Sequence, residues 1–183
     1  MKNINYKGVL ITAAVVVAVI LLCVFAFQGV QNKAIGLEEQ ITTAQSEIKI
    51  QEKRRADLIP NLVDCVKAYD KHEYETLMAV IEARGSDNDE VAAEVMTSVN
   101  VVAEQYPELK SNENYKQLML ELATTENLIA NTRKNYNTWV TKYNSYVRKF
   151  PNKGILNMLG YEVQTFDKLT FNVISDAPTN LFD

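Results

Sequence analysis

The longest uncharged stretch constrains this chain most. Gly8–Phe27 reads GVLITAAVVVAVILLCVFAF, 20 residues without a charged side chain. At about 1.5 Å per residue, a helix of this length spans roughly 30 Å, the thickness of the hydrocarbon core of a bilayer. The sequence therefore predicts a transmembrane helix over residues 8–27, with the lipid bilayer as its partner.

A cleaved signal peptide is the alternative interpretation of this segment. The apolar region of a signal peptide is shorter, about 7–15 residues, and a cleavage site flanked by small residues follows it. Gln28–Asn32 offers no such site, and Leu22 stands where a lipoprotein signal needs a small residue before Cys23. We therefore expect an anchor that is not cleaved.

The charges that flank the segment predict its orientation. Lys2 and Lys7 precede it, whereas all 23 acidic residues of the chain follow it. Basic residues stay on the cytoplasmic side of a membrane. We therefore expect residues 1–7 in the cytoplasm and residues 28–183 outside. The net charge of −4 argues against a general nucleic-acid-binding protein.

Few helix breakers follow the anchor. Between Leu37 and Phe150 the chain has one glycine and two prolines, which predicts long helices with short connections. No alternation of β-branched and polar residues indicates a sheet. We expect helices over residues 28–70, 73–84, 89–105, 111–150 and 155–159, a loop at 85–88, and an extended segment after Gln164.

Two stripes with heptad spacing indicate that the first and last long helices pack on each other. The first stripe comprises Leu37, Ile41, Ala44, Ile48, Gln51, Arg55, Leu58, Leu62, Cys65 and Tyr69. The second comprises Tyr115, Leu118, Leu122, Thr125, Ile129, Thr132, Tyr136, Trp139, Tyr143, Tyr146 and Phe150. If the helices over 28–70 and 111–150 pack antiparallel, residues of the two helices whose numbers sum to about 180 face each other. We therefore predict that Glu126 pairs with Arg54 or Arg55.

This pair has two interpretations. An ion pair in a helical core can set the register of the helices. Alternatively, it marks a polar cleft for a peptide or a small anion.

Pro60 leaves two arrangements of the first long helix open, either a kinked continuous helix that reverses near Ala68–Glu73 or a new helix capped by Asp57. The stripe passes through position 60 in register, which favours the continuous helix.

Several segments resemble the motifs of the LemA family. Lys53–Val63 (KRRADLIPNLV) resembles its RR-x-DLIPNLV signature, and Tyr106–Asn114 resembles its YP-x-LK-x-NE segment. Thr125–Ala130 and the residues that follow resemble its last helix. The motif residues that we single out for structure or interaction are Arg54, Arg55, Asp57, Pro60, Asn61, Glu126, Asn127, Arg133, Tyr136 and Asn137. Leu128 and residues 29–48 depart from the family pattern.

The resemblance implies an all-α protein, in which the transmembrane helix precedes an antiparallel, up-and-down-type four-helix bundle over residues 28–165. Residues 166–183 would form an extended tail. It implies a single-pass protein of the bacterial cytoplasmic (inner) membrane. It implies no known activity. Many members are encoded near membrane peptidases or other envelope proteins, which suggests a scaffold or adaptor by association only.

The residues themselves suggest no catalytic, cofactor or metal site. His72 is the only histidine and stands among charged residues, so we expect it on a solvated face. We interpret the acidic pairs Glu38–Glu39 and Asp87/Asp89 as exposed charges, and Cys65 as a buried, inert thiol. No metal-ligand or nucleophile motif occurs. Six bases and no acid lie between Asn127 and Tyr161, a pattern typical of a solvated face or of contact with anionic headgroups.

Three functions follow from these observations. The first is a non-catalytic, membrane-anchored scaffold or adaptor whose partners are other membrane or envelope proteins, with a homo-oligomer left open. The second is a sensor or binding module with a peptide or small ligand in a polar interior. The third and most remote is an envelope hydrolase.

Overall fold

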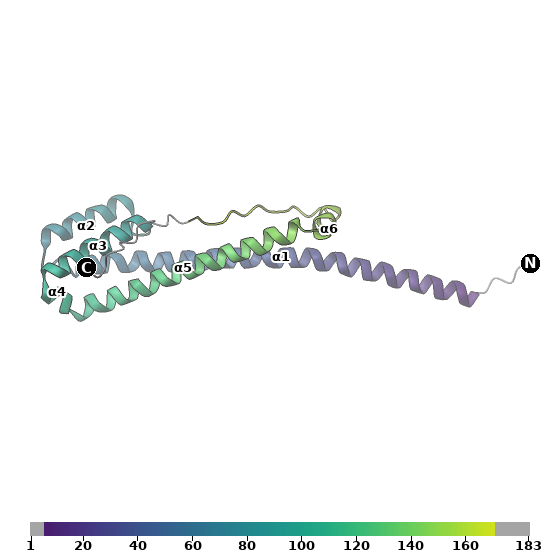
Figure 1. The fold of residues 1–183 in the computed structure, drawn as a ribbon, viewed down its shortest axis with the longest axis horizontal. Helices are drawn as coiled ribbons and strands as arrows, with labels where there is room; N and C mark the ends of the chain where they lie inside the picture. Colours follow the sequence, from purple (N-terminus) through teal and green to yellow (C-terminus); the bar gives the residue numbers. More distant parts are fainter. Residues whose placement is uncertain (1–5, 171–183) are drawn as a thin grey trace, which may run out of the picture. The chain divides into compact units, whose positions relative to one another are not determined.

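The computed structural model describes residues 6–170 and is all-α (Figure 1). The six helices are α1 (Tyr6–Asp64), α2 (Lys71–Arg84), α3 (Asp89–Gln105), α4 (Pro107–Ser111), α5 (Glu113–Arg148) and α6 (Asn152–Met158). No strand lies between residues 6 and 170. The prediction of an all-α chain with a long apolar N-terminal helix is confirmed. The prediction missed α4, the single helical turn after Tyr106, and it began α6 three residues late.

Two compact units make up the chain. Unit 1 combines residues 1–42 with 136–183, and unit 2 comprises residues 43–135. Both α1 and α5 contribute to each unit, so pairing between these two helices can be examined in each unit by itself.

Unit 2 encloses a hydrophobic core to which five helices, α1 to α5, contribute. The end of α1 supplies Ile59, Leu62 and Val63, whereas α2 supplies Leu77 and Ile81. The other buried members include Val66, Val91, Ala92, Val95, Val99, Val102, Ala103, Leu109, Tyr115 and Leu122. In α3 these residues recur at steps of three and four, so one face of this helix is buried.

Short polar side chains cap the N-termini of three helices of unit 2, namely α2, α3 and α5. The Asp70 carboxylate accepts a hydrogen bond from the backbone of Glu73 at 3.0 Å, and Asn88 does the same for Glu90 at 2.8 Å. Asn112 accepts from the backbone of Asn114 at 2.9 Å, as expected of a cap for α5. Each cap satisfies backbone N–H groups that the first helical turn leaves without a partner.

Pro60 lies inside α1, which continues to Asp64. The continuous helix through Pro60 is therefore the arrangement found, and α2 follows after a turn that ends at its cap, Asp70. The turn begins at Cys65, where the chain leaves helical geometry. The first helix therefore ends at Asp64, before the expected end at residue 70.

The predicted stripes need two corrections. In the first stripe the buried positions near the end of α1 are Ile59, Leu62 and Val63; Leu58 is half-buried. In the second stripe, Phe150 is 93% exposed. Phe150 is exposed because α5 ends at Arg148, so the helical spacing no longer places it on the buried face.

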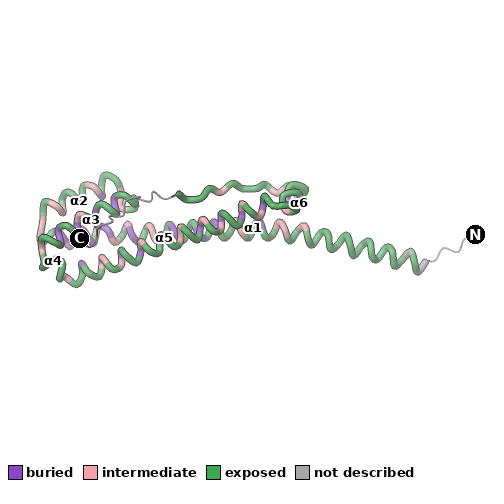
Figure 2. The backbone as a smooth tube through the Cα atoms, viewed as in Figure 1, coloured by how far each residue is buried: buried purple, intermediate pink, exposed green. Residues whose placement is uncertain are grey.

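In unit 1 the N-terminal part of α1 packs against nothing. Every described side chain from Leu10 to Ala26 is exposed, as the green part of the tube in Figure 2 shows. This part of α1 is long and apolar enough to cross a membrane. The only hydroxyl in the apolar segment, that of Thr12, donates to the carbonyl of Gly8 at 2.8 Å. That bond satisfies the hydroxyl within the helix, as a lipid environment requires.

Further along unit 1, α1 and α5 do pack on each other. Ala34 and Ile41 of α1 are buried, as are Val140, Tyr143 and Val147 of α5. The hydroxyls of Tyr143 and Tyr161 both donate to Glu38 Oε1 at 2.6 Å. Glu38 was interpreted as an exposed charge, and this interpretation is wrong: Glu38 is half-buried, and the phenols of the buried Tyr143 and the half-buried Tyr161 bind its carboxylate. Burial and this carboxylate raise the pKa of Tyr143 to about 12.

The segment after α6, residues 161–170, lies along α5 in an extended conformation. Asn144 Nδ2 donates to the carbonyl of Phe166 at 3.0 Å. The Asn137 side chain donates to the carbonyl of Leu169 at 2.9 Å and accepts from its N–H at 2.8 Å. Asn137 and Asn144 are seven helical residues apart, a rise of about 10.5 Å. Phe166 and Leu169, which they bind, are three residues apart and span this distance only when the chain is fully extended. The predicted extended segment is thus found up to Thr170; the rest of the predicted tail, 171–183, lies outside the described residues.

The Asn137 amide makes both backbone hydrogen bonds of Leu169, so we expect Asn137→Ala to release the segment 161–170 from α5. Limited proteolysis of the full chain in detergent should then cut within 161–170 faster than in the parent protein. Asn135→Ala, two residues away at an exposed position, is the matched control. Equal cleavage rates for the two variants would contradict the role of Asn137.

Candidate functional site

A buried arginine stands at the centre of the polar interior of unit 2. Arg55 of α1 is 1% exposed. Its Nη1 donates to Glu126 Oε1 at 3.2 Å, and its Nη2 donates to Asp89 Oδ1 at 2.6 Å and to the carbonyl of Asp87 at 2.7 Å. The predicted pairing of Glu126 is therefore found with Arg55. Arg54 is exposed and lies 3.8 Å from Glu121.

A second arginine extends this cluster. Arg133 of α5 donates to both carboxylate oxygens of Asp89, at 2.8 and 3.0 Å, and to Glu52 Oε1 at 2.6 Å. Two guanidinium groups and three carboxylates thus connect α1, α3 and α5 within unit 2. We call Glu52, Arg55, Asp89, Glu126 and Arg133 the arginine network. Planar guanidinium groups suit it because each can bind carboxylates with two parallel donors.

Sequence reasoning missed Asp89 and Glu52. Asp89 is exposed, as expected, but the sequence analysis did not predict that two arginines bind its carboxylate. Its position at the start of α3, directly after the Asn88 cap, depends on Gly85. Gly85 has a φ of +82°, and a Cβ there would approach Asp87 Oδ1 to 2.6 Å. The glycine therefore permits the turn that brings Asp87 and Asp89 to Arg55.

The arginines hold Asp89 in its charged form. Burial by itself would raise the pKa of this carboxyl, but hydrogen bonds from Arg133 and Arg55 and the charges of both arginines outweigh burial and lower the pKa. The hydrogen bonds to Asp89 and Glu52 in turn raise the pKa of Arg133. Both shifts favour the charged forms of Asp89 and Arg133, so the ion pair between them is stabilised.

A cavity of about 410 Å³ opens beside the network. Arg55, Asp89, Met96, Asn100 and Glu126 are among its lining residues. The Nε of Arg55 is buried and has no hydrogen-bond partner among the described atoms. Asn100 Oδ1 accepts from the hydroxyl of Tyr115 at 2.8 Å. The cavity is thus lined by a guanidinium group and two carboxylates.

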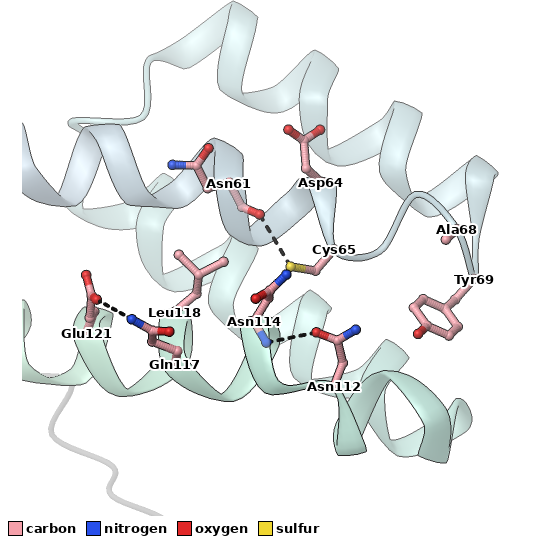
Figure 3. Close-up of a pocket in the computed structure, with 10 residues that line it drawn as sticks. All are labelled: Asn61, Asp64, Cys65, Ala68, Tyr69, Asn112, Asn114, Gln117, Leu118 and Glu121. Carbon is pink, nitrogen blue, oxygen red and sulfur yellow. Dashed lines mark hydrogen bonds between the residues drawn. The ribbon is translucent and has the colours of Figure 1, made fainter.

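A larger pocket of about 580 Å³ lies where α1 ends and α5 begins (Figure 3). Amides and acids dominate its wall. The lining residues are Asn61, Asp64, Cys65, Ala68, Tyr69, Asn112, Asn114, Gln117, Leu118 and Glu121. Figure 3 shows the Asn114 amide pointing towards Cys65 and the Gln117 amide bonded to Glu121. Asn61 of the first family-like motif and Asn112 and Asn114 of the second line the same pocket. The spacing of these residues in the sequence did not predict that they lie close together.

The other motif residues occupy separate places. Asp57 is exposed and pairs with Lys53 at 3.5 Å, and the Asn61 amide donates to the carbonyl of Asp57 at 2.9 Å. Asn127 is exposed on α5. In unit 1, the Tyr136 hydroxyl donates to the carbonyl of Asp167 at 3.3 Å. Tyr136 and Asn137 therefore hold the extended segment in unit 1, and they do not belong to the arginine network.

Unit 2 contains the single histidine of the sequence, His72, and one of its two cysteines, Cys65. His72 is exposed, as expected. No group of three or more His, Cys, Asp or Glu side chains suited to a metal ion occurs between residues 6 and 170. Burial, and then the charge of Asp64, raise the pKa of the half-buried Cys65 thiol. A raised pKa disfavours the reactive thiolate.

The fold and the network define an all-α protein whose apolar N-terminal helix is a candidate membrane anchor. Residues 44–179 match the LemA family. A curated relative, "Protein LemA" of Metamycoplasma hominis, is 30% identical over 138 residues, which cover 69% of this chain and 63% of the relative. The chain therefore belongs to the LemA family. The match spans less than two thirds of the length of that relative.

We expect Arg55→Met to lower the free energy of unfolding by about 3 kcal/mol, because it removes a buried charge from two carboxylates. Chemical denaturation of the full chain in detergent, followed by circular dichroism, measures this. Arg54→Met is the matched control at the neighbouring exposed position, where we expect a change within about 0.5 kcal/mol. Similar losses in both variants would mean that the network does not hold unit 2 together.

The lowered pKa of Asp89 predicts an acid-sensitive stability. The unfolded chain takes up this proton near pH 3.8 and the folded chain only at lower pH, so the stabilisation is present above pH 3.8 and is lost as the pH falls through the folded pKa. Asp89→Asn should unfold less steeply on acidification, although it is less stable at pH 7. Glu90→Gln, an exposed neighbour, should titrate like the parent protein; if it lost the same acid dependence, the assignment to Asp89 would be wrong.

Proposed function

We propose that this chain is a non-catalytic scaffold or adaptor. A single N-terminal helix would anchor it in the cytoplasmic membrane of a bacterium, and residues 28–183 would face outside. The observation that carries the proposal is the exposed apolar part of α1, which runs without a break into a helical domain. A helix of that composition is stable in lipid and costly to expose to water.

The charges and the family support the rest of the proposal. The excess of basic residues before the apolar segment supports a cytoplasmic N-terminus. The arginines and carboxylates of the arginine network pair with one another inside unit 2. Such pairing suits a domain that presents a stable surface to partners. The partners would be other membrane or envelope proteins, and self-association is one form that such contacts could take.

Cysteine labelling tests the topology. In a Cys23→Ser, Cys65→Ser background, Ser111→Cys and Asn3→Cys each provide one thiol, on opposite sides of the apolar segment. A membrane-impermeant maleimide should label the first variant in intact spheroplasts and the second only after lysis. The reverse pattern, or release of the chain by buffer alone, would overturn the proposed anchoring.

The scaffold role needs a separate test. A photo-crosslinking amino acid placed at exposed positions of unit 2 should give the same discrete products in repeated cultures, and mass spectrometry identifies them. Exposed positions on α2 and α3 can be compared, because a docking surface gives products from one face only. A chain that stays monomeric and uncrosslinked at all positions would refute the scaffold.

A second candidate function is a sensor or binding module for a peptide or small ligand. The cavity beside Arg55 and Glu126 favours it, because a dry, packed interior would leave no room for a ligand. Short peptides should raise the melting temperature of the full chain in detergent if they bind there. Thr97→Leu, which would fill the cavity from its rim, should abolish that shift. No shift with any peptide would remove this candidate.

A further inference from the structure

Exposed apolar side chains and bases occur together where α5 ends and α6 lies. Phe150 is 93% exposed and Met158 is 76% exposed. Arg148, Lys149 and Lys153 are exposed beside them. We call the segment Arg148–Met158 the tip. Between Asn127 and Tyr161 the sequence has no acidic residue, so no carboxylate of this stretch neutralises the bases of the tip.

The exposure of Phe150 and Met158 does not result from a loose α6. Leu156 of the same helix is fully buried, and Asn152 Nδ2 donates to the carbonyl of Tyr146 at 3.1 Å. These contacts fix α6 against the end of α5. Two large apolar side chains are thus held in the open on an ordered segment, which is typical of a surface that contacts a partner.

Contacts within unit 1 place the tip beside the end of the apolar segment. The Tyr146 hydroxyl donates to the carbonyl of Val30 at 3.2 Å. The Lys33 ammonium lies 5.3 Å from the centre of the Tyr146 ring. Val30 is three residues beyond Phe27, the last residue of the uncharged stretch. Three helical residues rise about 4.5 Å, which lies within the interfacial layer, roughly 5–7 Å deep, next to the hydrocarbon core.

We propose that the tip is a second membrane contact, in which Phe150 and Met158 enter the interfacial layer of the bilayer that α1 crosses, and Arg148, Lys149 and Lys153 bind its anionic headgroups. This inference rests on the proposed anchoring of α1. Apolar side chains flanked by bases are the composition that binds this layer. Each base near an anionic surface favours the bound state about fivefold. With two contacts, unit 1 cannot rotate freely about the axis of α1.

Tryptophan fluorescence of the full chain in vesicles tests the depth of the tip. Trp139 is the only tryptophan, so Trp139→Phe with Phe150→Trp places a single indole at position 150. We expect its emission to shift to the blue in vesicles of phosphatidylcholine and phosphatidylglycerol, and lipids brominated near the headgroup to quench it. The matched control is Trp139→Phe with Leu120→Trp, at a 69% exposed position near the other end of α5; it should show neither effect.

Charge reversal tests the bases. In the Phe150→Trp background, Arg148→Glu, Lys149→Glu and Lys153→Glu together should reduce the quenching in vesicles that contain phosphatidylglycerol and leave it unchanged in pure phosphatidylcholine. Lys71→Glu, Lys110→Glu and Lys116→Glu, three exposed reversals in unit 2, should have no effect in either. Circular dichroism of both triple variants shows whether they keep the helical fold.

The outcomes separate this inference from the proposed function. A chain that does not float with the vesicles overturns the anchor, and the tip with it. A chain that floats, but whose indole at position 150 is quenched no more than that at position 120, keeps the anchor and overturns the membrane contact. Equal loss of quenching in both triple variants overturns the role of the bases in the tip.

Discussion

Burial of a charged arginine is the constraint on which unit 2 depends. A guanidinium group at 1% exposure is costly unless carboxylates and carbonyl oxygens surround it. Glu126 on α5, and Asp87 and Asp89 around the start of α3, supply those groups. One side chain of α1 therefore specifies the register of α5 and the position of α3. Packing of apolar residues alone would tolerate several registers, because a heptad stripe repeats along its length.

In unit 1 a half-buried carboxylate, that of Glu38, is stabilised by two neutral donors. Glu38 accepts from the hydroxyls of Tyr143 and Tyr161, which ties α1 to α5 and to the extended segment at once. Asn137 and Asn144 then hold the backbone of that segment. Hydrogen bonds to its backbone hold the extended segment 161–170 on α5. Because its own side chains do not make these bonds, the side-chain pattern of the segment does not predict them. The two units thus use polar contacts for specificity and apolar contacts for burial.

The arithmetic of facing residues predicted that Glu126 pairs with Arg54 or Arg55, because two regular helices keep one register over their shared length. The structure has the pair with Arg55. The arithmetic also fits Glu38 and Tyr143 in unit 1, although the sequence analysis did not single out this pair. The contacts of Asp89 with the arginines were not predicted, because the position of Asp89 depends on the direction of the α2–α3 turn at Gly85. Phe150 was placed in the buried stripe because periodicity by itself does not tell where a helix ends. The pocket of Figure 3 was missed for a third reason, since its wall comes from two motifs about 50 residues apart.

The sequence by itself determined the helical class, the apolar N-terminal segment and the family, because uncharged length, heptad spacing and motif order are all local properties of a chain. Only the tertiary structure decided which carboxylates surround Arg55 and Arg133, where a cavity remains beside them, and which side chains the end of α5 leaves exposed. These features arise from the meeting of distant segments, and their geometry depends on turns whose direction the residue pattern does not specify.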